Sequence, residues 1–257
     1  MANEPKDPKK TDEEPEKTEK EHGDSLPEEG PFPKPGCMTN LPDRRTTVFL
    51  LCFLPLQVFV IPTLLGMLAA QNKLSIVDAN YICYVIGMVT VFLLGWNFLK
   101  EGFRRYLCHP LGNAIFIVGS YLALNALDIL VQLLMQEFMV FDNLNNDAVA
   151  EMAVSSTGKT IAMAVFMAPL AEEPLFRGGI FGALYTKSRP AAYLVSAALF
   201  SLYHIWSYAL LDVGYLWYFF LYLPSGLILA LAYERTDSIW TPIFLHMLVN
   251  FVAMSAI

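Results

Sequence analysis

Seven apolar runs, each about 20 residues long or longer, constrain the fold of this chain more than any other feature. A helix needs roughly 20 mainly apolar residues to cross a bilayer, where each backbone polar group must be satisfied within the protein. The sequence therefore predicts an all-α, polytopic membrane helix bundle with about seven transmembrane helices. The expected spans cover residues 46–70, 76–99, 110–136, 160–182, 190–210, 214–233 and 238–257.

Charge is concentrated at the N-terminus. Residues 1–43 hold 12 Asp or Glu, 6 Lys or Arg and 8 Pro. Such a segment buries too little apolar surface to offset the entropy of ordering. We therefore expect a disordered, acidic, Pro-rich cytoplasmic tail over residues 1–43 and a transmembrane domain over residues 44–257. The bilayer lipids are the expected partner, and nothing points to a nucleic-acid partner.

The basic residues of the loops indicate an orientation in the cell membrane. Loops on one side carry Arg44 with Arg45, Lys100 with Arg104 and Arg105, and Lys187 with Arg189. The opposite side carries only Lys73 and Lys159, and its largest loop is acidic. Because basic loops remain in the cytoplasm, the expected topology has a cytoplasmic N-terminus and an extracytoplasmic C-terminus.

The stretch LAEEPLFRGG places three ionisable residues inside the fourth expected span. Each costs about 2.5–3.5 kcal/mol at that depth on insertion scales, so such residues usually have a function. Glu173 and Arg177 are four residues apart on one helical face, in the order that favours an ion pair. Glu172 points about 100° away from Glu173. It has no local cation, which suits a general base.

Two prolines and two glycines interrupt the same span. Pro169 and Pro174 each remove a helical hydrogen bond, and freed carbonyls are tolerated where helices pack or where a cavity holds water. Gly178 and Gly179 permit a neighbouring helix to approach closely. We expect an irregular helix here. In the third span, Asn125 and Asp128 share a face and either join helices or line a cavity.

Two later spans carry the remaining polar groups. His204 lies in FSLYH, and His246 and Asn250 lie four residues apart in HMLVN, hence on one face. With the carboxylates, these side chains supply what peptide hydrolysis needs, a base for water and donors for an oxyanion. The alternatives are separate interhelical hydrogen bonds or a divalent metal site, since His and Glu ligate zinc. The single-helix zinc motif HExxH is absent from the sequence.

Three short motifs together resemble a known family. EEPLFR, FSLYH and HMLVN match E-E-x-x-x-R, F-x-x-x-H and H-x-x-x-N. Their order and spacing resemble those of the CPBP family (CAAX proteases and bacteriocin-processing enzymes, also called Abi proteins), which includes the Ras-converting CAAX endopeptidase. The resemblance covers residues 158–257. It implies an intramembrane endopeptidase that acts on a membrane-tethered peptide or protein, either lipidated or carrying a leader peptide.

The resemblance also implies roles for the motif residues. Glu172 matches the glutamate proposed to activate water, and His204 matches the residue that helps to orient this water. His246 and Asn250 match the groups proposed to stabilise the oxyanion or to complete the site. We expect Glu172 to face His204. We also expect the cleaved bond in the cytoplasmic half of the bilayer, because Glu172 lies nearer the inner end of its span.

Two alternatives stay open at this point. Glu173 and Arg177 would have a supporting role in a metal-free site, whereas a metal-dependent site would bind a divalent metal such as zinc through Glu172, Glu173, His204 and His246. The chain could also be a non-enzymatic membrane immunity or peptide-binding protein on the same fold. A proton- or cation-coupled transporter is disfavoured, because the first three spans and the sixth carry few charges.

Overall fold

Residues 32–136 and 144–255 are described by the computed structural model, and every regular element in these ranges is helical. The fold class is therefore the predicted all-α bundle. Within the described residues, the helical elements form seven segments. These are α1 (Arg44–Pro55), η1 (Leu56–Val60) and α2 (Ile61–Ala70); α3 (Ile76–Cys108); α4 (Pro110–Met135); α5 (Leu144–Ile161), η3 (Ala162–Met167), α6 (Ala168–Glu173), η4 (Pro174–Phe181) and α7 (Gly182–Tyr185); α8 (Arg189–Ala209); η5 (Val213–Tyr218) and α9 (Phe219–Thr236); and α10 (Trp240–Ser255).

Each expected span corresponds to one of these segments. Five of them are long and apolar enough to cross a membrane, and α10 is a shorter apolar helix. The segment α8, on the expected span 190–210, is not among these five. The protein is therefore a multi-pass membrane protein. One difference lies before residue 160, where a loop was expected and α5 forms instead, with a kink at Ser156 (φ −161°, ψ 79°). Ala, Glu and Met favour a helix even where the sequence is too polar to span a bilayer.

The segment that carries EEPLFR is irregular, as predicted. The π-helical stretches η3 and η4 flank the short helix α6, and a proline lies at the start of both α6 and η4. Prolines remove helical donors, and π-helical turns occur frequently at functional sites. The side chains of this segment therefore do not follow the even angular step of an ideal α-helix.

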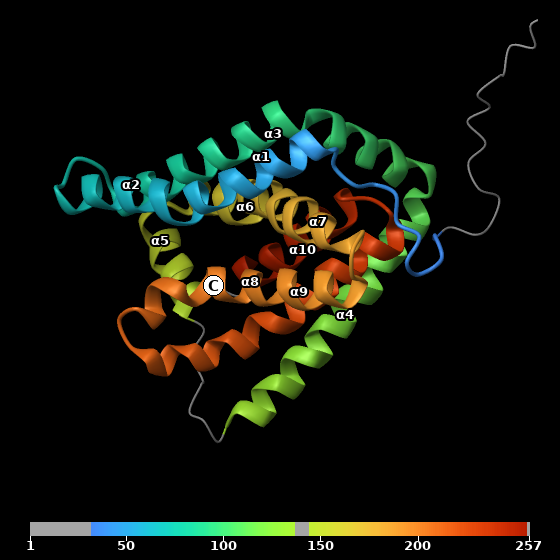
Figure 1. Ribbon diagram of the computed structural model, residues 1–257. Coiled ribbons are helices and arrows are strands. Elements are labelled where there is room, and N and C mark those ends of the chain that lie inside the picture. The colour runs from blue at the N-terminus through green and yellow to red at the C-terminus, as the bar shows by residue number, and fades with distance from the viewer. Residues whose placement is uncertain (1–31, 137–143, 256–257) are drawn as a thin grey trace, which may run out of the picture. The chain divides into compact units, whose positions relative to one another are not determined.

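Two glycines let this segment pack tightly against its neighbours. A Cβ atom on Gly178 would lie 2.9 Å from the Phe98 ring, and one on Gly179 would lie 3.2 Å from Cβ of Leu50. The stretch η4 packs on α1 and α8, whereas α6 packs on α3 and α10. Figure 1 shows α6 and α10 in the interior of the helix arrangement, with α1 and α3 on one side and α8 and α9 on the other.

The end of the expected tail is ordered. Residues 1–31 lie outside the described residues, so the expected disorder there remains a prediction. By contrast, Met38 and Asn40 are buried, and the backbone N–H of Gly36 donates to Glu234 Oε1 at 2.8 Å. Residues shortly before position 44 are thus held against α9 and the turn that follows it, because their backbone N–H groups find acceptors there.

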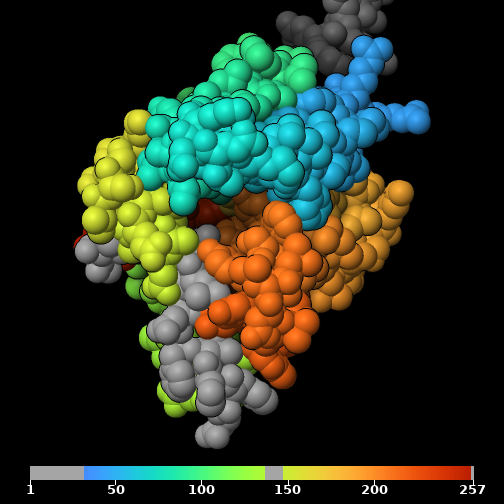
Figure 2. Space-filling view, turned by 90° about the vertical axis from the view of Figure 1, so that its left-hand side faces the viewer, coloured from blue at the N-terminus to red at the C-terminus, as the bar shows by residue number. Residues whose placement is uncertain are grey.

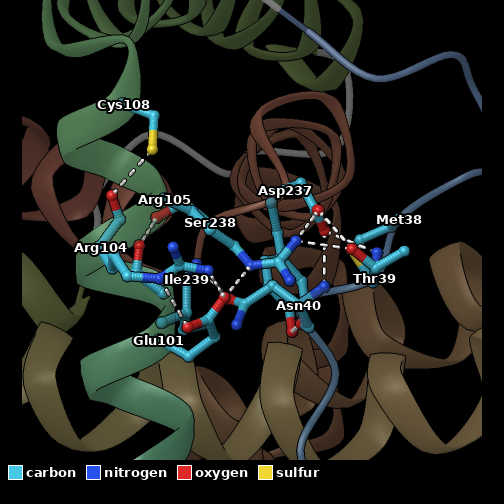
Figure 3. Close-up of polar contacts among 12 residues, drawn as sticks. Met38, Thr39, Asn40, Glu101, Arg104, Arg105, Cys108, Asp237, Ser238 and Ile239 are labelled. Carbon is cyan, nitrogen blue, oxygen red and sulfur yellow. Dashed lines mark hydrogen bonds and ion pairs between the residues drawn. The ribbon is translucent and has the colours of Figure 1, made fainter. Parts of the chain in front are cut away.

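Four residues form a polar latch between this N-terminal segment, α3 and the turn between α9 and α10 (Figure 3). Asp237 Oδ1 accepts from the backbone N–H groups of Thr39 (2.7 Å) and Asn40 (2.6 Å), and Asp237 Oδ2 accepts from the Thr39 hydroxyl at 2.8 Å. Arg105 donates to Asp237 and to the Thr39 hydroxyl. Asp237 itself has a left-handed backbone (φ 49°). One carboxylate therefore joins three sequence-distant segments.

The latch predicts a stability effect at Asp237. Asp237→Asn keeps a residue that tolerates the left-handed conformation, but it replaces charged hydrogen bonds by neutral ones and removes the ion pair. We expect the free energy of unfolding to fall by about 1–3 kcal/mol, measured as a lower melting temperature in detergent. Asp147→Asn, on the exposed side of α5, is the matched control. Equal melting temperatures for the two variants would contradict the latch.

Candidate functional site

The two oxygens of Glu172 have different surroundings. The side chain lies at the end of α6 and is only 4% exposed. Its Oε1 accepts from the hydroxyl of Tyr84 on α3 (3.2 Å) and from that of Tyr203 on α8 (3.1 Å). Its Oε2 has no hydrogen-bond partner among the described residues. One oxygen is thus held in place while the other remains available.

Glu173 is the centre of a buried charged cluster. Its Oε1 accepts from Arg177 Nη1 at 3.1 Å and from His246 Nδ1 at 2.8 Å. The predicted ion pair is therefore confirmed, and both of its side chains are fully buried. Arg177 also donates to the Gly226 carbonyl at 3.1 Å, and its guanidinium lies 4.3 Å from the centre of the Phe200 ring. The cluster joins α6, η4, α8, α9 and α10.

The tautomer of His246 follows from this contact. A carboxylate only accepts hydrogen bonds, so Nδ1 of His246 carries the hydrogen that is donated to Glu173. Its other nitrogen, Nε2, lies 4.0 Å from Glu172 Oε2. This separation exceeds a direct hydrogen bond, and both residues line the same cavity. The unpartnered carboxylate oxygen and the imidazole nitrogen therefore lie close together at the cavity wall.

His204 and Asn250 differ from the expected arrangement. His204 Nδ1 lies 2.9 Å from the Phe200 carbonyl, and its ring stacks on Tyr222 with centroids 4.5 Å apart. The imidazole within 4.0 Å of Glu172 is that of His246, rather than the expected His204. Asn250 donates through Nδ2 to the Ala164 carbonyl at 2.8 Å, which leaves its second amide hydrogen.

A cavity of about 1200 Å³ connects these groups. Figure 2 shows a hollow bounded by α2, α5 and the turn between α8 and α9, with α10 in its depth. Asn125 and Asp128 line the cavity, which is one of the two alternatives that the sequence left open. The site residues at its wall are Tyr84, Glu172, Tyr203, His204, His246 and Asn250.

The cavity and the latch lie toward opposite ends of the helices. The cavity is lined by Ser75 and Ile76, at the start of α3, whereas Arg105 of the latch is near the end of this 33-residue helix. At 1.5 Å per residue, the two ends of α3 are about 45 Å apart. The cavity therefore extends away from the arginine-rich end that was expected to be cytoplasmic.

The side chains do not fit a metal site built from the four residues considered above. Among the described residues, no group of three His, Cys, Asp or Glu side chains is arranged to hold a metal ion. Nδ1 of His246 is engaged by Glu173, and Nδ1 of His204 by a carbonyl. Glu172 Oε1 is engaged by two hydroxyls. A metal would require these contacts to be rearranged.

Three tyrosines at the site were not predicted. Tyr84 and Tyr203 hold Glu172, and Tyr222 stacks on His204. Tyr203 lies inside FSLYH, so its position beside a motif histidine was an available signal. Tyr84 and Tyr222 carry no comparable signal, since aromatic residues in apolar spans usually serve packing.

Comparison with known proteins gives consistent results. The family model described as Type II CAAX prenyl endopeptidase Rce1-like matches residues 156–252. The chain is 30% identical over 196 residues to "Putative membrane peptidase YdiL" of Bacillus subtilis (strain 168), covering 74% of this chain and 73% of the relative. It is 24% identical over 177 residues to UPF0177 protein YxdF of Lactococcus lactis subsp. lactis (strain IL1403), covering 66% of this chain and 91% of the relative. No solved structure matches the chain.

The buried cluster predicts a large effect at Arg177. Arg177→Met leaves the Glu173 carboxylate buried with His246 as its remaining partner. Removal of one member of a buried ion pair costs about 3–5 kcal/mol, so we expect a strongly lowered melting temperature in detergent. Arg104→Met changes an exposed pair with Glu101 and should have little effect. Similar losses in both variants would contradict a structural role of the buried pair.

Proposed function

Because the chain belongs to the CPBP family of CAAX-type membrane proteases, we propose that it is an intramembrane endopeptidase. It hydrolyses a peptide bond in a membrane-tethered substrate, using a water molecule that Glu172 activates. The observation that supports this proposal best is the unpartnered Oε2 of buried Glu172 at the wall of a large cavity. A held carboxylate with one available oxygen is suited to accept a proton from water.

Two groups assist the water. Tyr84 and Tyr203 fix the orientation of Glu172 by donating to its other oxygen. His204 donates from Nδ1 to the Phe200 carbonyl, so its neutral ring leaves Nε2 as an acceptor. His204 can therefore accept a hydrogen bond from water and help to orient it, which matches its role by resemblance. It acts from the cavity wall rather than through contact with Glu172.

Glu173 and His246 resemble the carboxylate–imidazole pair of other hydrolases. A buried carboxylate on Nδ1 fixes the tautomer of an imidazole and stabilises its protonated form. His246 held in this way by Glu173 can donate from Nε2 to the developing oxyanion once it is protonated. The second amide hydrogen of Asn250 is a further donor for this oxyanion. Arg177 positions Glu173 through the ion pair between them.

The proton balance of the reaction is simple. Water adds to the scissile carbonyl carbon as its proton passes to Glu172 and from there to the neighbouring Nε2 of His246, which gives a tetrahedral intermediate beside a protonated imidazole. The carbon–nitrogen bond then breaks, and this proton returns through Glu172 to the leaving amine. The products are a carboxylic acid and an amine, and Glu172 returns to its ionised form.

The charges of the cavity wall favour one class of substrate over another. Among the described lining residues, the wall carries Asp128 and Glu151 besides Glu172 and no Lys or Arg. A free C-terminal carboxylate bound near the site would find no cation to pair with. We therefore favour an internal peptide bond, as in a leader-peptide substrate, over cleavage next to a charged C-terminus. With the N-terminus cytoplasmic, the cavity would open toward the extracytoplasmic side.

Glu172→Gln tests the mechanism directly. The amide keeps the shape but cannot accept the proton, so we expect hydrolysis to fall by at least about 100-fold, within the range for loss of a general base. The assay uses the full chain in proteoliposomes with two fluorogenic peptides, one S-farnesylated and one with a leader-type membrane anchor. Each peptide is prepared as a free acid and as a C-terminal amide. Glu101→Gln at the latch end is the matched control. Unchanged hydrolysis by Glu172→Gln would refute the proposal.

The same assay tests the metal-free mechanism. Because the motif residues do not form a metal site, we expect hydrolysis to survive dialysis against EDTA and 1,10-phenanthroline, with full activity before any metal is restored. Loss of activity that returns on addition of Zn²⁺ would contradict the mechanism. The melting temperature, measured in parallel, separates a chemical effect from unfolding.

A further inference from the structure

Gln57 is a buried polar residue that the proposed mechanism does not use. It lies in the π-helical stretch η1, within the first membrane span. Its side chain is buried, with 4% exposed, and it lines the same cavity as Glu172. Its Oε1 has no hydrogen-bond partner among the described residues. A buried acceptor without a partner is rare in folded proteins and calls for an explanation.

The orientation of the amide is fixed by its neighbours. Nε2 of Gln57 donates to the Cys83 carbonyl at 3.2 Å and lies 3.5 Å from the Cys83 sulfur. A flipped amide would place two carbonyl oxygens against each other, so Oε1 is the atom left without a partner. Tyr84, the residue after Cys83, holds Glu172. Gln57 is therefore joined to the reacting group through two consecutive residues of α3.

The side chain of Gln57 packs against the backbone of α3 at a glycine. A Cβ atom on Gly87 would lie 2.7 Å from Nε2 and 2.9 Å from Oε1 of Gln57. A real Cβ atom does not come this close to other atoms. The amide of Gln57 can therefore pack flat against α3 only if position 87 is glycine. The glycine at position 87 and the carbonyl of Cys83 together hold Gln57 in one orientation, and Gln57 is one of the residues that line the cavity.

We propose that Gln57 is a substrate-binding residue whose Oε1 accepts a backbone N–H of the peptide near the scissile bond. This inference rests on the proposed function and names a contact for its substrate. A peptide in an extended conformation presents N–H groups at regular intervals, and a fixed acceptor on the cavity wall sets its register. Gln57 would thus decide which carbonyl lies next to Glu172.

Binding measured without turnover tests the proposal. The protein is the full chain carrying Glu172→Gln in nanodiscs, and the probe is a fluorescent leader-type peptide amide with a membrane anchor, whose Kd is read by anisotropy. Gln57→Leu should weaken binding by about three- to tenfold, as expected for one hydrogen bond. In a series of probes, each backbone N–H is replaced in turn by an ester oxygen. One of these probes should bind equally weakly to the Glu172→Gln protein and to the protein that also carries Gln57→Leu.

Two glycine variants provide a matched pair. Gly87→Ala displaces the amide of Gln57 and should weaken binding as Gln57→Leu does, with no further loss in the double variant. Gly95→Ala lies two turns along the same helix, where an added Cβ meets nothing within 4 Å, and should bind normally. This pair also tests the contact if Gln57→Leu fails to fold.

Three results would overturn the proposal. These are an unchanged Kd in Gln57→Leu, an ester effect that persists undiminished in that variant, or no binding of any probe. A purely structural role would lower the melting temperature and weaken all ester probes alike. Failure of the proposed function looks different, since the protein with Glu172 intact would bind peptides in a Gln57-dependent manner but would not hydrolyse them.

Discussion

The buried carboxylate of Glu173 is the interaction on which the rest of the site depends. One of its oxygens accepts from Arg177 and from His246, so it fixes the helix that carries EEPLFR against the last helix of the bundle. A buried charge is tolerated only when partners compensate it, and Arg177 supplies that compensation. Glu172 is next to it in sequence, but its hydrogen-bond partners within the described part of the chain are two tyrosine hydroxyls. The two adjacent glutamates therefore have different roles, because they contact different residues.

Polar groups are distributed unevenly along the bundle. At the arginine-rich end, charged groups are paired in the latch and in a second cluster in which Glu234 accepts from Arg189, Tyr185 and Tyr193. Among the described residues, polar atoms of the cavity residues Gln57, Asp128 and Glu172 have no hydrogen-bond partner, and the same holds for one atom each of Asn113, Glu173, Arg177 and Thr241. Paired groups stabilise a fold, whereas unpaired buried groups cost stability and are usually retained for function. The latch and the Glu234 cluster hold the helices together, and the unpaired atoms of the cavity residues offer contacts to a ligand.

The sequence predicted the helical segments, five of which are long and apolar enough to cross a membrane, and the Glu173–Arg177 pair, because both follow from local spacing along one helix. It did not predict that Glu172 would lie beside His246 instead of His204. That contact depends on how α6 packs against α10, more than 70 residues away in the sequence. Tyr84 and Gln57 were missed for a related reason. They lie in the first half of the chain, outside the motifs, and a single polar or aromatic residue in an apolar span has many possible roles.

The hydrogen-bonding capacity of the cavity wall constrains the order of events in the proposed reaction. Both histidines donate from Nδ1 to protein acceptors, so in their neutral forms both present Nε2 as an acceptor. Glu172 Oε2 and Gln57 Oε1 are acceptors as well. Such a wall favours ligands that bring donors, namely water and the N–H groups of a peptide. It becomes complementary to an oxyanion only when His246 is protonated, beside the carboxylate of Glu173. The resting site therefore binds the ground state through acceptors, and the transition state gains a donor that the ground state lacks, which is the condition for catalysis rather than mere binding.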